Sequence, residues 1–206
     1  MYARTTTLRG DPQAVDDGIA NVRDEVMPMV RSMDGCTGLS MLVDRDTGRC
    51  IVTSAWQSEE AMRASAEAVR SSRSRAAEIL RADPQVAEWE IALMHRVHEA
   101  GDSACTRVIW AQRTAAEGSM GPEDFVRDLL PRLEELPGFC SANLMVDRTT
   151  GQTAMTVTYE SRDAMSRASE RAGALREEFH RSTGMDITEV AEFDLVLAHL
   201  RVPETV

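Results

Sequence analysis

The chain contains the same pattern twice, and this internal repeat restricts its fold more than any other feature of its 206 residues. A constant offset of 103 positions places the segment MLVDRDTG, residues 41–48, on the segment LMVDRTTG, residues 144–151. The same offset places Trp56 on Tyr159. Matches that keep their order along the chain are the signature of a repeated structural unit. We therefore interpret the sequence as a tandem duplication.

The repeat extends to the end of each half. After one inserted residue, EWEIALMH at 88–95 matches EFDLVLAH at 192–199. A polar, glycine-containing stretch separates the halves and is typical of a linker. The sequence thus predicts two domains, residues 1–98 and residues 104–202.

Each half predicts the element order strand, helix, strand, strand, helix, strand. In the first half the expected elements are a strand Tyr2–Leu8, a helix from Asp11 to Met33, strands Thr37–Asp44 and Arg49–Trp56, a helix from Ser58 to Arg81, and a strand Val86–Val97. Apolar residues in the first helix follow the spacing of one buried stripe, and Pro28 should kink this helix or close its last turn. The Asp46-Thr47-Gly48 sequence favours a hairpin turn.

This βαββαβ order is that of the ferredoxin-like unit, whose antiparallel sheet carries both helices on one face. The other face stays uncovered in a single unit. Two such units can cover their open faces with each other. We therefore expect an α+β fold in which two tandem ferredoxin-like units pack their sheets into an intramolecular α+β barrel.

Composition excludes several classes of function. All 23 basic residues are arginine, so a Schiff-base lysine and a Walker-type phosphate loop are excluded. The net charge of −11 disfavours nucleic acid as a partner. The sequence has no apolar run of about 18 residues and no signal-peptide pattern at its start. We expect a cytoplasmic protein that does not bind membranes.

The four cysteines are far apart in the sequence and lack the paired spacing of a zinc site. We interpret them as free thiols and expect no metal and no cofactor.

The sequence resembles the dimeric α+β barrel superfamily, and within it the antibiotic-biosynthesis-monooxygenase-like group. In the second half the resemblance rests on LPGFCSANLMVD at 136–147 and on the strand that ends in Tyr159. In the first half it rests on DGCTGLSMLVD at 34–44 and on AWQSEEAM at 55–62. Members of this group are usually homodimers of single units, so a duplicated chain would form a self-contained pseudo-dimer, with further homo-oligomerisation left open.

The resemblance implies two chemistries. Some members oxidise aromatic polyketides with molecular oxygen and no cofactor, and others degrade haem with a histidine about ten residues after the strand-three tryptophan. Ala66 lies ten residues after Trp56, and Ser169 lies ten residues after Tyr159. Without an axial imidazole, haem iron has no evident ligand. The resemblance therefore favours cofactor-independent oxidation of a small aromatic, polyketide-like or quinol-like substrate.

The candidate site residues occupy matching positions in the two halves. The catalytic candidates are Asn143, Trp56, His95 and His199, and the substrate-binding candidates are Arg4, Arg107, Ser40 and Tyr159. The imidazoles could act as bases, the amide could polarise a carbonyl, the aromatic side chains could border the substrate, and the guanidinium groups could hold a carboxylate or enolate oxygen.

Structural roles compete with each of these functions. Aromatic side chains at the end of strand three could simply lock the helix to the sheet, and the histidines could be solvated. Arg4 and Arg107 could form ion pairs with Asp44, Asp147, Glu88 or Glu192. The aligned Arg73 and Arg176 on the second helix are interpreted as part of a solvated face.

Three functions follow. The first is a cofactor-independent monooxygenase for a small aromatic substrate. The second is a non-catalytic small-molecule-binding or stress-associated protein that keeps the barrel for its cavity. The third is a purely structural role. The sequence names no substrate and leaves the number of sites open.

Overall fold

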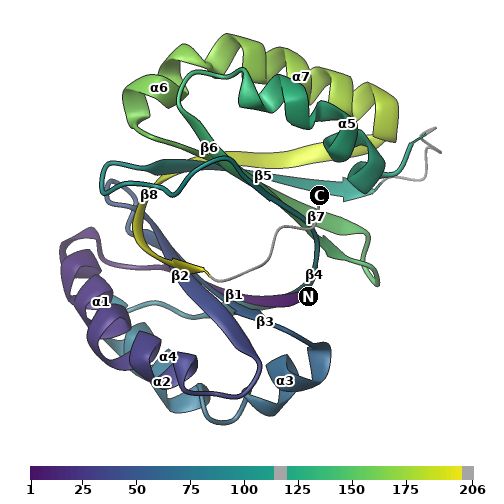
Figure 1. The fold of residues 1–206 in the computed structure, drawn as a ribbon. Helices are drawn as coiled ribbons and strands as arrows, with labels where there is room; N and C mark the ends of the chain where they lie inside the picture. The colour runs from purple at the N-terminus through teal and green to yellow at the C-terminus, as the bar shows by residue number, and fades with distance from the viewer. Residues whose placement is uncertain (114–119, 201–206) are drawn as a thin grey trace. The chain divides into compact units, whose positions relative to one another are not determined.

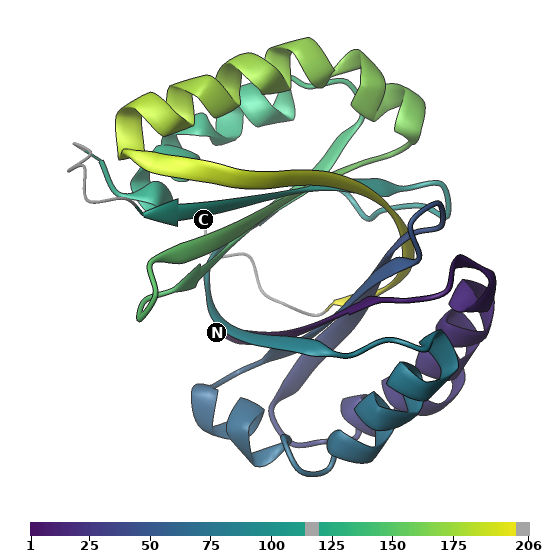
Figure 2. The same ribbon diagram turned by 180° about the vertical axis from the view of Figure 1, so that it is seen from behind.

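A computed structural model describes residues 1–113 and 120–200 (Figures 1 and 2). These residues form two compact units. Unit 1 contains Met1–Trp89 and residues 194–200, and unit 2 contains residues 90–113 and 120–193.

Unit 1 follows the predicted element order. Its elements are β1 (Tyr2–Arg9), η1 (Pro12–Ala14), α1 (Val15–Asn21), η2 (Val22–Val26), α2 (Met27–Arg31), β2 (Cys36–Asp44), β3 (Arg49–Trp56), α3 (Glu59–Ala64), α4 (Arg70–Leu80) and the first part of β4 (Gln85–Arg96). Strand β3 pairs antiparallel with both β1 and β2, so that Thr53 lies opposite Thr5 on one side and Ser40 on the other. Figure 1 shows α1, α2 and α4 along one face of this sheet.

Unit 2 repeats this arrangement. Its elements are β5 (Cys105–Arg113), α5 (Pro122–Glu134), β6 (Phe139–Asp147), β7 (Gln152–Tyr159), α6 (Arg162–Arg167), α7 (Ser169–Thr183) and the first part of β8 (Met185–Leu200). Strand β7 pairs antiparallel with β5 and β6. In Figure 2, α5 and α7 lie along one face of this sheet.

The last strand of each repeat takes part in both units. Residues 90–96 of β4 belong to unit 2, where Met94 pairs with Asn143 of β6. Residues 194–199 of β8 belong to unit 1, where His199 pairs with Leu39 of β2. The hydrogen-bonded order β1-β3-β2-β8-β5-β7-β6-β4 therefore closes on itself as a barrel. The predicted α+β class with two ferredoxin-like units is confirmed.

The β2–β3 hairpin forms where the sequence predicts it. The Asp44 carboxylate accepts hydrogen bonds from the backbone N–H of Asp46 (3.0 Å) and from the hydroxyl of Thr47 (2.6 Å). Gly48 closes the turn with a φ of +69°, a conformation that costs a residue with a Cβ atom. The second hairpin has the same construction, with Gly151 at a φ of +74°.

Both predicted long helices of the first repeat are interrupted. The stretch before Pro28 forms a π-helical segment, Val22–Val26, and the helix then continues to Arg31. Pro28 has no backbone N–H to donate, and this is a common cause of local departure from α-helical bonding. The helix predicted from Ser58 to Arg81 divides into α3 and α4, and near the break the Ser65 hydroxyl donates to the Met62 carbonyl (2.7 Å).

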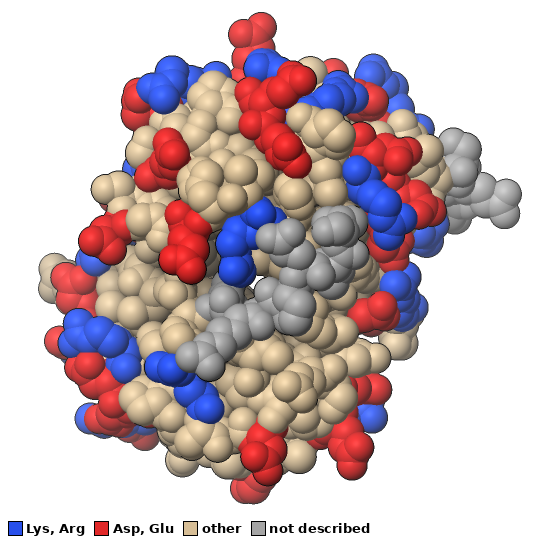
Figure 3. Space-filling model, viewed as in Figure 1, with Lys and Arg blue, Asp and Glu red and all other residues tan. Residues whose placement is uncertain are grey.

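None of the described helices is both long and apolar enough to cross a membrane. On the face of the molecule shown in Figure 3, acidic and arginine side chains are interspersed.

Candidate functional site

Each unit contains a cavity between its sheet and its helices. In unit 2 the walls come from β5, β6, β7, α5, α7 and the start of β8, and most of the lining is aliphatic. The polar side chains of the lining are Arg107, Thr153, Tyr159 and Arg176. The cavity of about 40 Å³ holds a few atoms. A ligand with an aromatic ring must displace side chains of the wall, which includes the flexible side chain of Met155.

Unit 1 has an equivalent cavity of about 60 Å³. Its polar lining consists of Arg4, Thr6, Ser54, Ser72 and Arg73. The repeat therefore places one arginine of the first strand and one arginine of the second long helix at each cavity.

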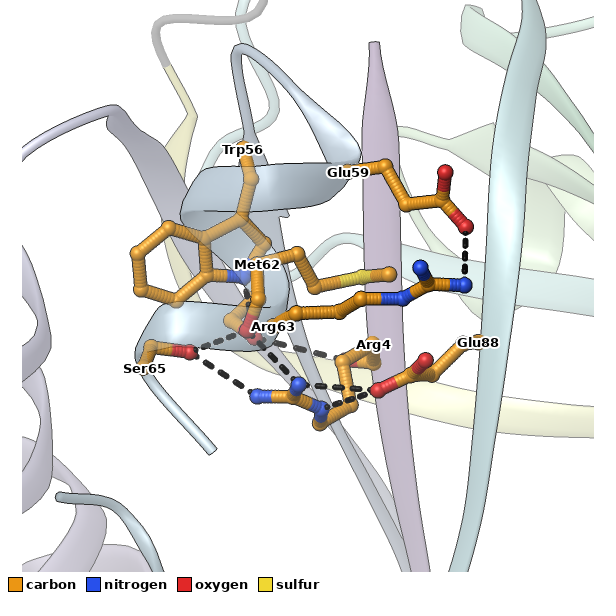
Figure 4. A network of polar contacts seen from close by, with 8 residues as sticks. Arg4, Trp56, Glu59, Met62, Arg63, Ser65 and Glu88 are labelled. Atoms are coloured by element: carbon orange, nitrogen blue, oxygen red, sulfur yellow. Dashed lines mark hydrogen bonds and ion pairs between the residues drawn. The ribbon is translucent and has the colours of Figure 1, made fainter. Parts of the chain in front are cut away.

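Arg4 is fully engaged within unit 1 (Figure 4). Its Nε and Nη2 donate to Glu88 Oε1 at 3.0 and 2.8 Å. Its Nη1 donates to Ser65 Oγ at 2.9 Å, and Nη2 also donates to the Met62 carbonyl at 2.7 Å. Only 4% of Arg4 is exposed. All three of its nitrogens have protein partners, so Arg4 connects β1, β4 and the end of α3.

Arg107 occupies the same place in unit 2 and is equally buried, with 4% exposed. Its Nε and Nη2 donate to Glu192 Oε1 at 3.1 and 2.6 Å, and Nη2 also donates to Ser169 Oγ at 2.9 Å. Its Nη1 is buried and has no hydrogen-bond partner among the described residues. The expected ion pairs of Arg4 and Arg107 are thus present, with Glu88 and Glu192 as partners.

One residue accounts for the different bonding of the two arginines. The offset of the repeat places Ala168 where unit 1 has Ser65. Unit 2 carries its hydroxyl one position later, on Ser169, and one residue turns a helical side chain by about 100°. The hydroxyl of Ser169 therefore reaches Nη2 of Arg107, and Nη1 lacks the partner that Ser65 provides in unit 1.

The prediction that Arg73 and Arg176 lie on a solvated helix face is wrong. Both are half-buried and line the cavities. Burial lowers the pKa of Arg73, and the charge of Arg4 lowers it further. Burial and then the charge of Arg107 lower the pKa of Arg176 in the same way. Helical spacing could have found them, since Arg73 stands between Val69 and Ala76, and Arg176 between Ala172 and Phe179, at the i, i+4, i+7 positions of one helix face.

Nη1 of Arg176 is also buried and has no hydrogen-bond partner in the described part of the chain. The unit 2 cavity is therefore lined by two guanidinium groups, Arg107 and Arg176, each with a buried and unpaired Nη1.

The two aromatic candidates lie in different surroundings. Tyr159 lines the unit 2 cavity, and the guanidinium carbon of Arg107 lies 5.9 Å from the centre of its ring. Burial raises the pKa of the Tyr159 hydroxyl, and the charges of Arg107 and Arg176 partly oppose this rise. Trp56 is fully buried in the unit 1 core, where its Nε1 donates to Ser54 Oγ at 3.0 Å.

Ser40 and Asn143 occupy matching positions on β2 and β6. Their neighbours Leu39 and Leu144 line the two cavities. Alternation along a strand therefore directs Ser40 and Asn143 to the opposite face of each sheet. Asn143 Oδ1 is buried there without a hydrogen-bond partner in the described part of the chain.

The two candidate histidines lie outside both cavity linings. His95 stacks on Phe139, with ring centres 6.3 Å apart, and its Nε2 lies 2.8 Å from Glu134 Oε1 without hydrogen-bond geometry. His199 is half-buried on β8. The structure thus brings Arg107 and Tyr159 together and adds Arg176, whereas the other candidates lie elsewhere.

No group of three or more His, Cys, Asp or Glu residues within 1–113 and 120–200 has the arrangement of a metal site. Burial raises the pKa of Cys50 and of Cys140 to about 11, so both are thiols at neutral pH. The chemistry available at the unit 2 cavity is therefore that of two cationic donors and one neutral phenol around an apolar space.

The comparisons with known proteins agree with this architecture. The family model described as antibiotic biosynthesis monooxygenase matches residues 1–76. The uncharacterized protein Rv2557 of Mycobacterium tuberculosis is 48% identical over 206 residues, which cover all of this chain and 92% of the relative. The chain belongs to the antibiotic biosynthesis monooxygenase-like family.

Solved structures show the same fold at low sequence identity. A proposed monooxygenase from Lactobacillus acidophilus NCFM superposes with a TM-score of 0.68 at 11% identity, covering 97% of this chain and 96% of that protein. An anthrone oxidase-like protein superposes with a TM-score of 0.64 at 11% identity, covering 97% and 93%. This family member therefore has its relatives' architecture, and its activity has to be argued from its own cavities.

Proposed function

We propose that the chain is a cofactor-independent monooxygenase that oxidises a small aromatic substrate with an acidic C–H group in the unit 2 cavity. The observation that carries the proposal is the meeting of Arg107, Arg176 and Tyr159 at one apolar cavity. Membership of the family and the likeness to an anthrone oxidase-like protein support it.

The proposed reaction converts a methylene group flanked by aromatic rings into a carbonyl group. The substrate loses a proton to solvent water to give a carbanion, whose charge is shared with an enolate oxygen. The carbanion adds to molecular oxygen, and protonation gives a hydroperoxide. Loss of water then leaves the carbonyl, so that one oxygen atom enters the product and the other leaves as water. The substrate supplies all the electrons, and no external reductant is needed.

The residues of the cavity would stabilise the anion. Guanidinium groups in an apolar space attract an enolate oxygen more strongly than they do in water, and this attraction lowers the pKa of the substrate C–H group. Tyr159, whose pKa is raised by burial, stays protonated and can donate a hydrogen bond. The apolar wall would hold the rings and exclude water.

The test uses anthrone, a C–H acid that oxygen converts to anthraquinone. We expect the protein to accelerate oxygen uptake and anthraquinone formation above the spontaneous rate, in equal molar amounts. Heat-denatured protein is the control for spontaneous oxidation. Arg73→Gln, in the unit 1 cavity, is the matched variant that should keep the activity. A rate equal to the spontaneous one would contradict a monooxygenase of this substrate class.

A second function is favoured by one observation. In the part of the chain that the structure describes, no side chain lining the unit 2 cavity is a base at neutral pH, because Arg107, Arg176 and Tyr159 are its only titratable members. A protein that binds a ligand without converting it needs no base. Ligand binding without oxygen uptake would support this non-catalytic function.

A further inference from the structure

Each guanidinium group at the unit 2 cavity has one nitrogen whose burial costs free energy that no hydrogen bond offsets. A buried donor without a partner loses its hydrogen bonds to water and gains none in return. Arg107 Nη1 and Arg176 Nη1 are both in this position among the described residues, and both side chains line the same cavity. Arg107 is 96% buried, since only 4% of it is exposed, so its Nη1 cannot simply turn to bulk solvent.

The charges in the same cavity are not balanced. Glu192 pairs with Arg107 at 2.6 Å, whereas Arg176 forms no ion pair with a described residue. Burial of Arg176 and the nearby charge of Arg107 both disfavour its cationic form and lower its pKa. A negative charge between the two groups would relieve the repulsion and satisfy both donors.

The equivalent place in unit 1 is already satisfied. Ser65 accepts from Nη1 of Arg4, and all three nitrogens of Arg4 have partners within the unit. An anion there would have to replace a hydrogen bond that the protein makes for itself. Because Ala168 stands where unit 1 has Ser65, Nη1 of Arg107 lacks the hydrogen-bond partner that Nη1 of Arg4 has.

The unit 2 cavity adjoins a hollow on the surface. Arg176 and Ile187 line both the cavity and a shallow surface hollow, which is otherwise bordered by residues such as Glu177, His180 and Asp186. Arg176 therefore lies between the cavity and the surface hollow.

We propose that unit 2 alone holds an oxyanion-binding site, in which Nη1 of Arg107 and Nη1 of Arg176 bind the carboxylate or enolate oxygens of an apolar ligand. The proposal rests on the proposed function in placing the ligand in the same cavity, but it requires no turnover. The net charge of −11 repels anions at long range, so selectivity must come from these two donors. The volume of about 40 Å³ suits the charged head of the ligand, while the wall side chains move to admit its ring.

Benzoate and its uncharged isostere benzamide are the first probes, titrated into the full chain with ligand-observed NMR. We expect benzoate to bind at least tenfold more tightly than benzamide, because a hydrogen bond to a charged group is worth about a factor of ten or more. A second arm uses 4-nitrophenolate to distinguish a carboxylate from a phenolate oxygen. Binding of either anion more tightly than benzamide supports the site. Equal affinity for benzoate and benzamide, or no binding of either anion at millimolar concentration, would overturn the proposal.

The decisive variant is Ala168→Ser, which gives unit 2 the equivalent of the Ser65 hydroxyl that accepts a hydrogen bond from Arg4 Nη1 in unit 1. We expect it to weaken benzoate binding about tenfold while all charges stay the same. Arg176→Gln should weaken binding at least as much and does not touch the Arg107–Glu192 ion pair. The matched control is Arg73→Gln, which removes the equivalent arginine of unit 1 and should leave benzoate affinity unchanged. Circular dichroism and thermal unfolding show that each variant is folded.

The outcomes separate this proposal from the proposed function. Benzoate binding that needs Arg176, without anthrone oxidation, supports the oxyanion site and contradicts the monooxygenase. Anthrone oxidation that neither benzoate nor Arg176→Gln reduces would show oxidation of this substrate class at a place other than the two guanidinium groups, and it overturns the oxyanion site. Loss of benzoate binding in Arg73→Gln, with Arg176→Gln unchanged, would place the anion in unit 1 and also overturn the proposal.

Discussion

The two units share a fold and differ at the guanidinium group on their first strand. In unit 1, Arg4 makes hydrogen bonds to a carboxylate, a hydroxyl and a carbonyl, and every nitrogen is used. In unit 2, Arg107 keeps the carboxylate and a hydroxyl, but its Nη1 lacks a partner among the described residues. Duplication thus allows one copy to use its arginine for stability while the other leaves donors available to a ligand.

The largest expected effect compares the two arginines directly. Arg4→Met removes a buried guanidinium group that forms hydrogen bonds with three residues. We expect a loss of about 4 kcal/mol in the free energy of unfolding. Arg107→Met removes fewer bonds and also one unpaired donor, so about 2 kcal/mol is expected. Urea unfolding followed by circular dichroism measures both. Equal losses would mean that Nη1 of Arg107 is satisfied in solution and that the units do not differ here.

The hairpin glycines give a second, smaller comparison. Both Gly48 and Gly151 have positive φ angles, so alanine at either position costs about 1 kcal/mol in backbone strain. A Cβ on Gly48 would also lie 2.2 Å from the Gly10 carbonyl oxygen, whereas on Gly151 its nearest contact is Arg113 Cβ at 3.1 Å. We expect Gly48→Ala to cost about 3 kcal/mol in total and Gly151→Ala about 1 kcal/mol.

Urea midpoints of these two alanine variants are the measurement. A Gly151→Ala variant as unstable as Gly48→Ala would show that backbone strain, not the contact with Gly10, dominates at both turns.

The smallest effect concerns one thiol in each unit. Cys50 and Cys140 both have a pKa raised by burial to about 11, against an ordinary value of 9.0. At pH 8 their thiolate fraction, and with it their alkylation rate, should be about a hundredfold below that of an exposed thiol. The two thiols also affect stability, because they lose their protons near pH 9 in the unfolded chain and near pH 11 in the folded protein. The free energy of unfolding should therefore fall as the pH rises from 9 to about 11.

Iodoacetamide labelling with mass spectrometry checks the thiols, with urea-unfolded protein as the fully reactive control. Rapid labelling of only one of the two in the native protein would show that its unit opens more readily.

Local patterns in the sequence were enough for much of the fold. The repeat and the Asp-Thr-Gly hairpin follow from residue types and their spacing, and the structure contains the hairpin. The sequence offers four acidic partners for Arg4 and Arg107, and the structure pairs Arg4 with Glu88. The prediction of one continuous second helix is wrong: near the break, the Met62 carbonyl accepts hydrogen bonds from Arg4 and from Ser65. Nothing in the local sequence shows the contact with Arg4, since Arg4 comes from a distant strand.

The cavity was less predictable than the fold. Tyr159 and Arg107 were among the candidates and lie at the unit 2 cavity, while Arg176 was assigned to solvent and lines it. Trp56 is a core residue with a hydrogen bond to Ser54. The sequence marks which positions correspond between the repeats, but it does not show which of them face the cavity.

The duplicated βαββαβ order and the α+β class can be predicted from the sequence alone, because hydrophobic periodicity and turn residues act over a few neighbouring positions. The different bonding of Arg4 and Arg107 becomes visible only in three dimensions. Whether a guanidinium nitrogen has a partner depends on a hydroxyl some 60 residues away, Ser65 for Arg4 and Ser169 for Arg107. A shift of that hydroxyl by one helical position is small in the sequence. In space it decides whether Nη1 of the guanidinium group has a hydrogen-bond partner.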